Sequence, residues 1–132
     1  MKIKDFVNNY QLHDSSLVKV DYDQSSQKVT LIIDLCFYEQ SDYVAGEPET
    51  GPVKVTFNKV SIFQWEDKEI YFETIFEHKL LKDGSVSFLL IKEDDGAGYE
   101  LVVKAEDVSV EKLSDNYYEE NDLDEPKFEF TS

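Results

Sequence analysis

The sequence predicts a mainly β protein, built as an antiparallel sandwich or a curled sheet with a short N-terminal helix. Two observations lead to this prediction. Short runs of alternating apolar and polar residues recur along the chain, and turn-forming residues separate them. Strands that follow one another without long helical segments favour antiparallel pairing over alternating strand–helix units. Because 132 residues is the length of one ordinary domain, we expect residues 1–132 to form a single domain.

The N-terminal segment predicts the helix. Between residues 2 and 11, apolar side chains recur at helical spacing at Ile3, Phe6, Val7 and Tyr10. A helix this short is not stable alone in water. We therefore expect its apolar stripe to pack on the sheet.

Two strands after this helix predict a central hairpin. In residues 16–23, Val18, Val20 and Tyr22 alternate with polar residues, which indicates a strand with one buried face. Residues 28–38 are apolar on both faces, which is typical of a central strand covered on both sides. The polar residues 24–27 have the length of a hairpin loop, so the two strands should be antiparallel neighbours.

The remaining strands are expected at residues 53–62, 70–76, 85–92 and 99–104, with an extension or a further strand as far as Leu113. A slip in the apolar phase predicts a β-bulge or a break near residues 58–59. Glycine and proline in residues 39–52 predict a long exposed loop. Residues 114–132 are acidic and polar, and we expect a mobile tail or an edge strand there.

The charge of the chain limits its partners. It has 29 acidic residues and 13 basic residues, all of them lysine, for a net charge of −16. A protein that binds DNA or RNA through phosphate contacts needs basic patches, so nucleic acid is not an expected ligand. A negative field speeds encounter with a positively charged partner. We expect a basic protein partner.

The candidate partner-binding residues are tyrosines and carboxylates in or beside the acidic loops. A tyrosine ring buries much area at a low entropy cost, and the carboxylates select a basic partner. These residues are Tyr38, Asp42, Tyr43, Glu47, Glu49, Asp94, Asp95, Tyr117 and Tyr118.

The three residue types of a hydrolytic triad stand together at His13, Asp14 and Ser15. Successive residues of an extended chain point in different directions, whereas triad side chains must meet. We interpret this segment as a structural turn in which Asp14 or Ser15 hydrogen-bonds nearby backbone N–H groups. No catalytic residue and no enzymatic activity are expected.

No metal or cofactor site is expected from the sequence either. His78 has Glu73 and Glu77 as neighbours, but their spacing matches no metal-binding motif. Calcium binding remains an alternative because the chain has many carboxylates, with Asp21, Asp23, Asp94 and Asp95 as candidates, although no EF-hand pattern occurs. The one cysteine, Cys36, excludes an internal disulfide. Neither an N-terminal apolar segment nor a membrane-spanning run occurs, so we expect a cytoplasmic protein without membrane contact.

One short motif resembles a known group of proteins. The turn Leu12-His13-Asp14-Ser15 before a β-hairpin resembles small uncharacterised bacterial domains, some of which look like immunity proteins of toxin systems. The resemblance implies a cytosolic inhibitor that neutralises a bacterial toxin by binding it, and the acidic charge would suit a basic, nuclease-like toxin. Two alternatives stay open: a ligand- or calcium-binding domain, and a structural subunit whose exposed strand edge pairs with itself.

Overall fold

A computed structural model describes residues 1–65, 69–71, 73–92, 96–121 and 129–131 of the chain. Its elements are α1 (Ile3–Asn9), β1 (Ser16–Asp23), β2 (Lys28–Cys36), the 3₁₀ helix η1 (Phe37–Glu39), β3 (Thr50–Trp65), β4 (Glu69–Tyr71), β5 (Glu73–Leu80), β6 (Val86–Ile91), β7 (Gly98–Lys112), α2 (Tyr117–Glu120) and β8 (Glu129–Thr131). The mainly β character and the short N-terminal helix are confirmed. The strands form a closed barrel, which is more specific than the expected sandwich or curled sheet.

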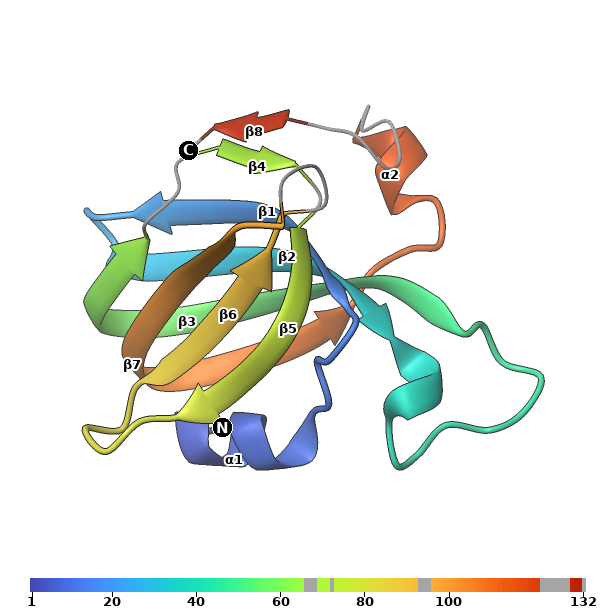
Figure 1. Ribbon diagram of the computed structural model, residues 1–132, viewed down its shortest axis with the longest axis horizontal. Coiled ribbons are helices and arrows are strands. Elements are labelled where there is room, and N and C mark those ends of the chain that lie inside the picture. Colours follow the sequence, from blue (N-terminus) through green and yellow to red (C-terminus); the bar gives the residue numbers. More distant parts are fainter. Residues whose placement is uncertain (66–68, 72, 93–95, 122–128, 132) are drawn as a thin grey trace.

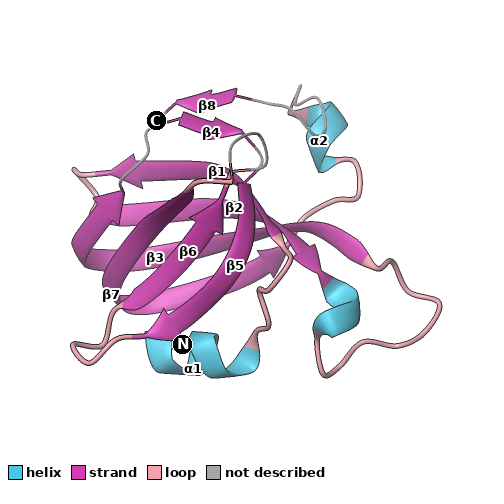
Figure 2. Ribbon diagram, in the orientation of Figure 1, coloured by secondary structure: helices cyan, strands magenta, loops and turns pink. Residues whose placement is uncertain are grey.

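The barrel has the strand order β1-β2-β3-β7-β6-β5, with every neighbouring pair antiparallel (Figure 1). The first two strands form the expected hairpin, and β2 lies between β1 and β3. Among the described residues, two pairs join β1 to β5 and so close the barrel: Ser16 with Thr74, and Leu17 with Glu73. The short strands β4 and β8 pair with each other in a separate sheet beside β1 (Figure 2).

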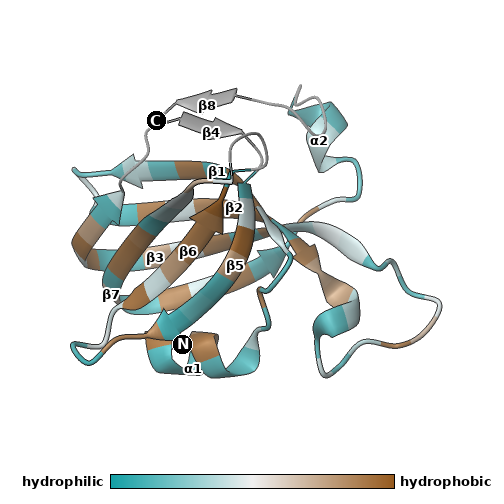
Figure 3. Cartoon of the chain, in the orientation of Figure 1, coloured by the Kyte–Doolittle hydropathy of each residue, from teal (hydrophilic) through white to brown (hydrophobic). Residues whose placement is uncertain are grey.

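The core fills the inside of the barrel, and α1 covers one of its ends (Figure 1). Along the strands, apolar stretches alternate with polar ones (Figure 3). The Phe6 side chain of α1 is fully buried, with its ring centroid 6.0 Å from that of Phe57 and 6.4 Å from that of Phe88. Ile3 is buried beside it, so the helix packs its apolar stripe on the barrel as expected.

The phase of β1 differs from the prediction that Val18, Val20 and Tyr22 share the buried face. The register with β2 shifts between Leu17 and Lys19, and Val18 turns to the outside of the barrel. Leu17 takes its place in the core next to Val20. The irregularity supplies one extra residue, which moves the following side chains to the opposite phase.

A second irregularity lies close to the expected bulge in β3. The strand runs without a break as far as Trp65, its register with β7 shifts between Val60 and Ile62, and Lys59 has a φ of +54°. The extension toward Leu113 belongs to one long strand, β7, not to a separate strand. In the C-terminal part of the chain, α2 and β8 are described, while the remainder of the acidic tail, at 122–128 and 132, lies outside the described residues.

The central strand β2 is covered on both faces, as its apolar pattern predicts. On the outside, Ile32 and Val18 form a small buried cluster. The side chains of Leu113, Tyr117 and Tyr118 pack over this cluster. The segment that follows β7 therefore crosses the outer surface of the β1–β2 hairpin.

Candidate partner-binding surface

The most prominent departure from the barrel is the segment formed by η1 and the loop of residues 40–49, which projects from one side of the molecule (Figure 1). Its base is closed by the backbone N–H of Tyr38, which donates a hydrogen bond of 3.1 Å to the carbonyl oxygen of Glu49. We call this segment the projecting loop. It contains the largest group of residues that the sequence marks as candidates.

The side chain of Gln40 anchors the projecting loop to the chain before β1. Its amide nitrogen donates to the carbonyl oxygen of Gln11 at 2.7 Å and to that of Cys36 at 2.9 Å. Its Oε1 accepts a hydrogen bond of 3.0 Å from the backbone N–H of Gln11. One side chain thus ties three backbone groups together, which fixes where the loop leaves the barrel.

Hydrogen bonds inside the projecting loop give it a defined shape. The Tyr43 hydroxyl donates to the carbonyl oxygen of Glu47 at 2.9 Å. The Glu47 carboxylate accepts a hydrogen bond of 3.2 Å from the backbone N–H of Val44, and the Glu47 N–H donates back to the Val44 carbonyl at 3.1 Å. A loop held in this way loses less conformational entropy when it binds a partner.

A groove of about 720 Å³ runs between the projecting loop, α1 and the end of β7. Aromatic and aliphatic side chains line it together with carboxylates: Tyr10, Phe37, Tyr43, Leu113, Asp42, Glu47 and Asp115. The ammonium group of Lys112 also lines the groove, and it lies 4.8 Å from the centre of the Phe37 ring. The carboxylates favour a cationic ligand group, and the rings can hold its apolar stem.

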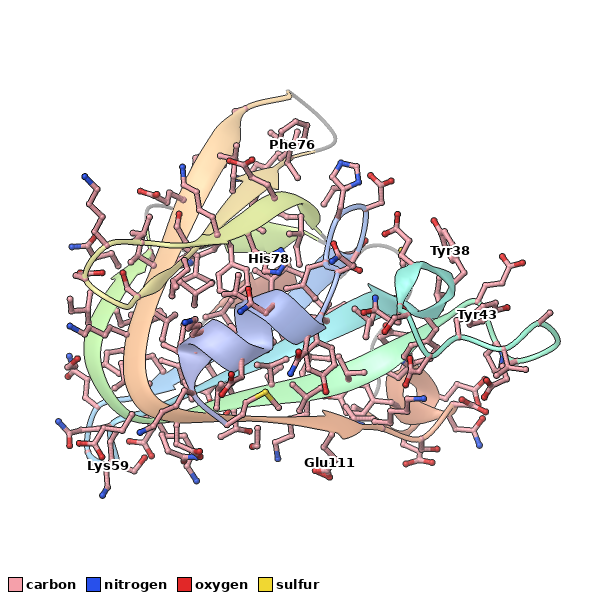
Figure 4. The ribbon with its side chains drawn as sticks, turned by 90° about the horizontal axis from the view of Figure 1, so that it is seen from below. Tyr38, Tyr43, Lys59, Phe76, His78 and Glu111 are labelled. Atoms are coloured by element: carbon pink, nitrogen blue, oxygen red, sulfur yellow. The ribbon has the colours of Figure 1, made fainter. Side chains whose placement is uncertain are left out.

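The outer face of the projecting loop exposes apolar area. The side chain of Val44 is 61% exposed and that of Tyr38 is 47% exposed. Tyr38 and Tyr43 lie on the same side of the molecule, and Lys59 lies at the opposite end (Figure 4). A hydrogen bond and electrostatic repulsion from Cys36 raise the pKa of the Tyr38 hydroxyl above its usual value.

The structure brings together some of the partner-binding residues that the sequence predicts. Tyr38, Asp42, Tyr43 and Glu47 belong to the projecting loop, and Glu49 stands exposed at its end. Asp94 and Asp95 lie outside the described residues. The groove also includes Phe37, Gln40, Leu113 and Asp115, which sequence reasoning did not select. Phe37 and Gln40 belong to the projecting loop itself, whereas Leu113 and Asp115 reach the groove only through the fold, which no local pattern reveals.

Tyr117 and Tyr118 do not share this exposed position. Both rings are half-buried over Val18 and Ile32, with their centroids 5.9 Å apart. Burial also raises the pKa of the Tyr117 hydroxyl. These two tyrosines cover the outer cluster of the barrel, so most of their ring area is already used in packing.

The segment of His13, Asp14 and Ser15 is a turn between α1 and β1. The Ser15 N–H donates to the Leu12 carbonyl at 3.0 Å, and Asp14 has a φ of +68°. The Ser15 side chain is fully buried, whereas the side chains of His13 and Asp14 are more than half exposed. The hydroxyl and the imidazole thus lie in different environments, which does not suit nucleophilic catalysis.

Of the carboxylates considered for calcium, that of Asp23 is used locally. Asp21 and Asp23 lie at the end of β1, and the Asp23 carboxylate accepts hydrogen bonds from the Ser25 hydroxyl at 2.7 Å and from the Ser25 N–H at 3.1 Å. These hydrogen bonds hold the pKa of Asp23 below its usual value. The arrangement is that of a hairpin turn closed by an aspartate side chain.

Together, the fold and the surface define an acidic β-barrel protein with a helix at one end and a preformed projecting loop. Comparison with protein-family models, with curated proteins and with solved structures finds no match. Within the described part of the chain, no helix combines the length and the apolar character needed to cross a membrane.

Proposed function

We propose that this chain is a non-enzymatic binding protein that captures a basic protein partner through the projecting loop and the adjoining groove. One observation carries the proposal. A single loop, shaped by its own hydrogen bonds, presents the exposed apolar side chains of Tyr38 and Val44 beside the carboxylates of Asp42 and Glu47. Exposed aromatic area next to selective charge is the composition of a protein-binding surface.

The groove suits a lysine or arginine side chain of the partner. Asp42, Glu47 and Asp115 supply three carboxylates against the ammonium groups of Lys112 and of the N-terminal Met1, and the latter is paired with Asp107 at 3.1 Å, so the groove has a net negative charge. A partner cation would pair with these carboxylates while its stem lies on the rings of Phe37 and Tyr43. The net charge of −16 would speed the approach of such a partner and make binding sensitive to salt.

The partner class that we propose to test first is a basic bacterial toxin. The resemblance of the Leu12-His13-Asp14-Ser15 turn and its hairpin to immunity-type domains points to this class. In a nuclease-like toxin, the carboxylates of the projecting loop would take positions that substrate phosphates occupy, and access to the substrate would be blocked. Binding alone would then neutralise the toxin.

The test uses the tagged protein to retrieve partners from a lysate of the source cells at low and high salt, followed by affinity measurements with the purified partner. The double variant Asp42→Asn with Glu47→Gln removes two charges from the surface. The control Asp21→Asn with Glu106→Gln removes two exposed charges elsewhere; the ion pair of Glu106 with Lys59 is 3.5 Å long and exposed, so its loss should matter little.

We expect the first double variant to weaken binding about tenfold, mainly through slower association, and the control to bind like the wild type. Equal affinity of both double variants for the partner would contradict the proposed surface. A partner that is acidic, or whose binding does not weaken with salt, would contradict the electrostatic mechanism.

A further inference from the structure

A second feature of the molecule lies at the base of the projecting loop and includes one of its residues, Glu39. The ligand atoms of His13, Asp14 and Glu39 all lie within 4.8 Å of one another, and His13 Nδ1 is 3.2 Å from the nearer carboxylate oxygen of Asp14. Among the residues that the structure describes, this is the one such group of three metal-ligating side chains. His13 and Asp14 precede β1, whereas Glu39 ends η1, so only the fold brings them together.

The two segments that carry this group are fixed to each other. The buried Ser15 hydroxyl accepts a hydrogen bond of 3.0 Å from the Cys36 N–H, which joins the turn before β1 to the end of β2. The side chain of Gln40 joins the residue after Glu39 to the backbone of Gln11. The Asp14 N–H donates to the Ile75 carbonyl at 3.0 Å. These contacts hold the backbone of the two segments, and so the Cα positions of the three residues, in place before any ligand binds.

One oxygen of the Glu39 carboxylate is not used by the residues that the structure describes. Its Oε2 is shielded from solvent and has no hydrogen-bond partner in the described part of the chain. A carboxylate oxygen that leaves water without a new partner is costly. The side chains of His13 and Asp14 are more than half exposed, so two of the three ligand groups face the solvent.

We propose that His13, Asp14 and Glu39 bind one divalent transition-metal ion, with Zn²⁺ as the favoured ion. One imidazole nitrogen with two carboxylates is a donor set that suits Zn²⁺, whose ligands lie at about 2.0–2.2 Å. The three ligand atoms need small side-chain rotations to reach one ion. A nitrogen donor disfavours Ca²⁺ and Mg²⁺, which prefer oxygen ligands.

This site differs from what the sequence indicates. The histidine considered there for a metal, His78, is half-buried against α1, with its ring centroid 6.4 Å from that of Phe6 and 6.5 Å from that of Phe88. The site assigned here uses the other histidine, from the turn interpreted as structural. A bound cation would also neutralise the negative charge of Glu39, which directly follows Tyr38 in the projecting loop. The metal site does not depend on the proposed partner binding.

The test is a titration of the tag-free, chelator-treated protein with Zn²⁺ by calorimetry, and with Co²⁺ as a spectroscopic probe. The variants His13→Gln and Glu39→Gln remove one ligand each. Their matched controls are His78→Gln and Glu49→Gln, which change the same residue types outside the site. Circular dichroism checks that every variant is folded.

We expect the wild type to bind one Zn²⁺ and to gain thermal stability from it. Loss of either ligand should weaken this binding at least about tenfold, and the controls should bind like the wild type. Added Ca²⁺ should not compete. The proposal is overturned if Zn²⁺ does not bind, if several ions bind weakly and equally to all variants, or if Glu39→Gln leaves the affinity unchanged.

Discussion

The hydroxyl oxygen of Ser15 accepts a hydrogen bond of 3.0 Å from the backbone N–H of Cys36, and both residues are buried. This contact joins the turn before β1 to Cys36, the last residue of β2, which directly precedes η1. The turn is therefore part of the support of the projecting loop. The same contact places His13 and Asp14 close to Glu39.

Replacement of Ser15 by alanine should destabilise the fold. The variant leaves the buried N–H of Cys36 without its partner, and an unsatisfied buried donor costs about 1–3 kcal/mol. Unfolding in urea, followed by circular dichroism, measures the change in the free energy of unfolding. The control is Ser109→Ala, because Ser109 is exposed on β7. Equal stability of the two variants would show that the Ser15 contact contributes little.

Replacement of Phe6 by alanine should remove much of the stability that α1 provides. The Phe6 ring is fully buried at the end of the barrel and lies near the rings of Tyr10, Phe57 and Phe88. Loss of a buried phenylalanine ring costs about 3–5 kcal/mol. The control Phe76→Ala truncates a ring that is 50% exposed and should cost far less. A loss below that of Phe76→Ala would contradict the role of α1 in closing the core.

Local patterns in the sequence are sufficient to predict the helix, the first hairpin and the bulge in β3, because each is encoded by neighbouring residues. Closure of the barrel depends on pairing of Leu17 with Glu73, which are far apart in the sequence. The outward turn of Val18 follows from a one-residue register shift that its alternating pattern does not reveal.

The candidate binding surface also has one part that the local sequence predicts and another part that only long-range contacts create. The composition of residues 39–52 is enough to mark an exposed acidic loop with tyrosines. The bond from Gln40 to Gln11 and the approach of Leu113 to the groove are long-range contacts without a local signal. For the same reason, Tyr117 and Tyr118 resemble exposed residues in the sequence, although they pack on the outer surface of the barrel.

Stability should fall as the solution is acidified below neutral pH because of His78. Burial lowers the pKa of His78 in the folded protein below its usual value of 6.5. The unfolded chain therefore binds this proton more readily than the folded protein. The contribution of neutral His78 to the free energy of unfolding is complete above pH 6.5, the usual pKa, which applies to the unfolded chain. It is lost as the pH falls from there through the lower pKa of the folded protein.

The variant His78→Gln, which has no titrating group, should show a smaller loss of stability between pH 7 and about pH 5.5 than the wild type. Urea unfolding at a series of pH values measures this difference. The same change at the exposed residue His13 serves as the control and should leave the His78 contribution in place. An unchanged slope in His78→Gln would assign the pH dependence to other groups.

Replacement of Gly51 by alanine should displace the ring of Phe37. Gly51 lies opposite Leu35 in the β2–β3 ladder, and a Cβ added there would lie 2.6 Å from Cε2 of the Phe37 ring. This distance is well inside van der Waals contact, so the ring must move. Overpacking of this kind costs about 1 kcal/mol when the neighbour is the end of a side chain that can shift.

The displaced Phe37 ring should also change the groove that it lines, so we expect Gly51→Ala to weaken partner binding as well as stability. The control is Gly98→Ala, whose Cβ would have its nearest neighbour at 3.6 Å, an ordinary contact. That variant should be as stable as the wild type or slightly more stable, because alanine restricts the unfolded chain. Urea unfolding and affinity for the purified partner measure the two effects. If Gly51→Ala matches Gly98→Ala in both, the Phe37 ring does not shape the groove.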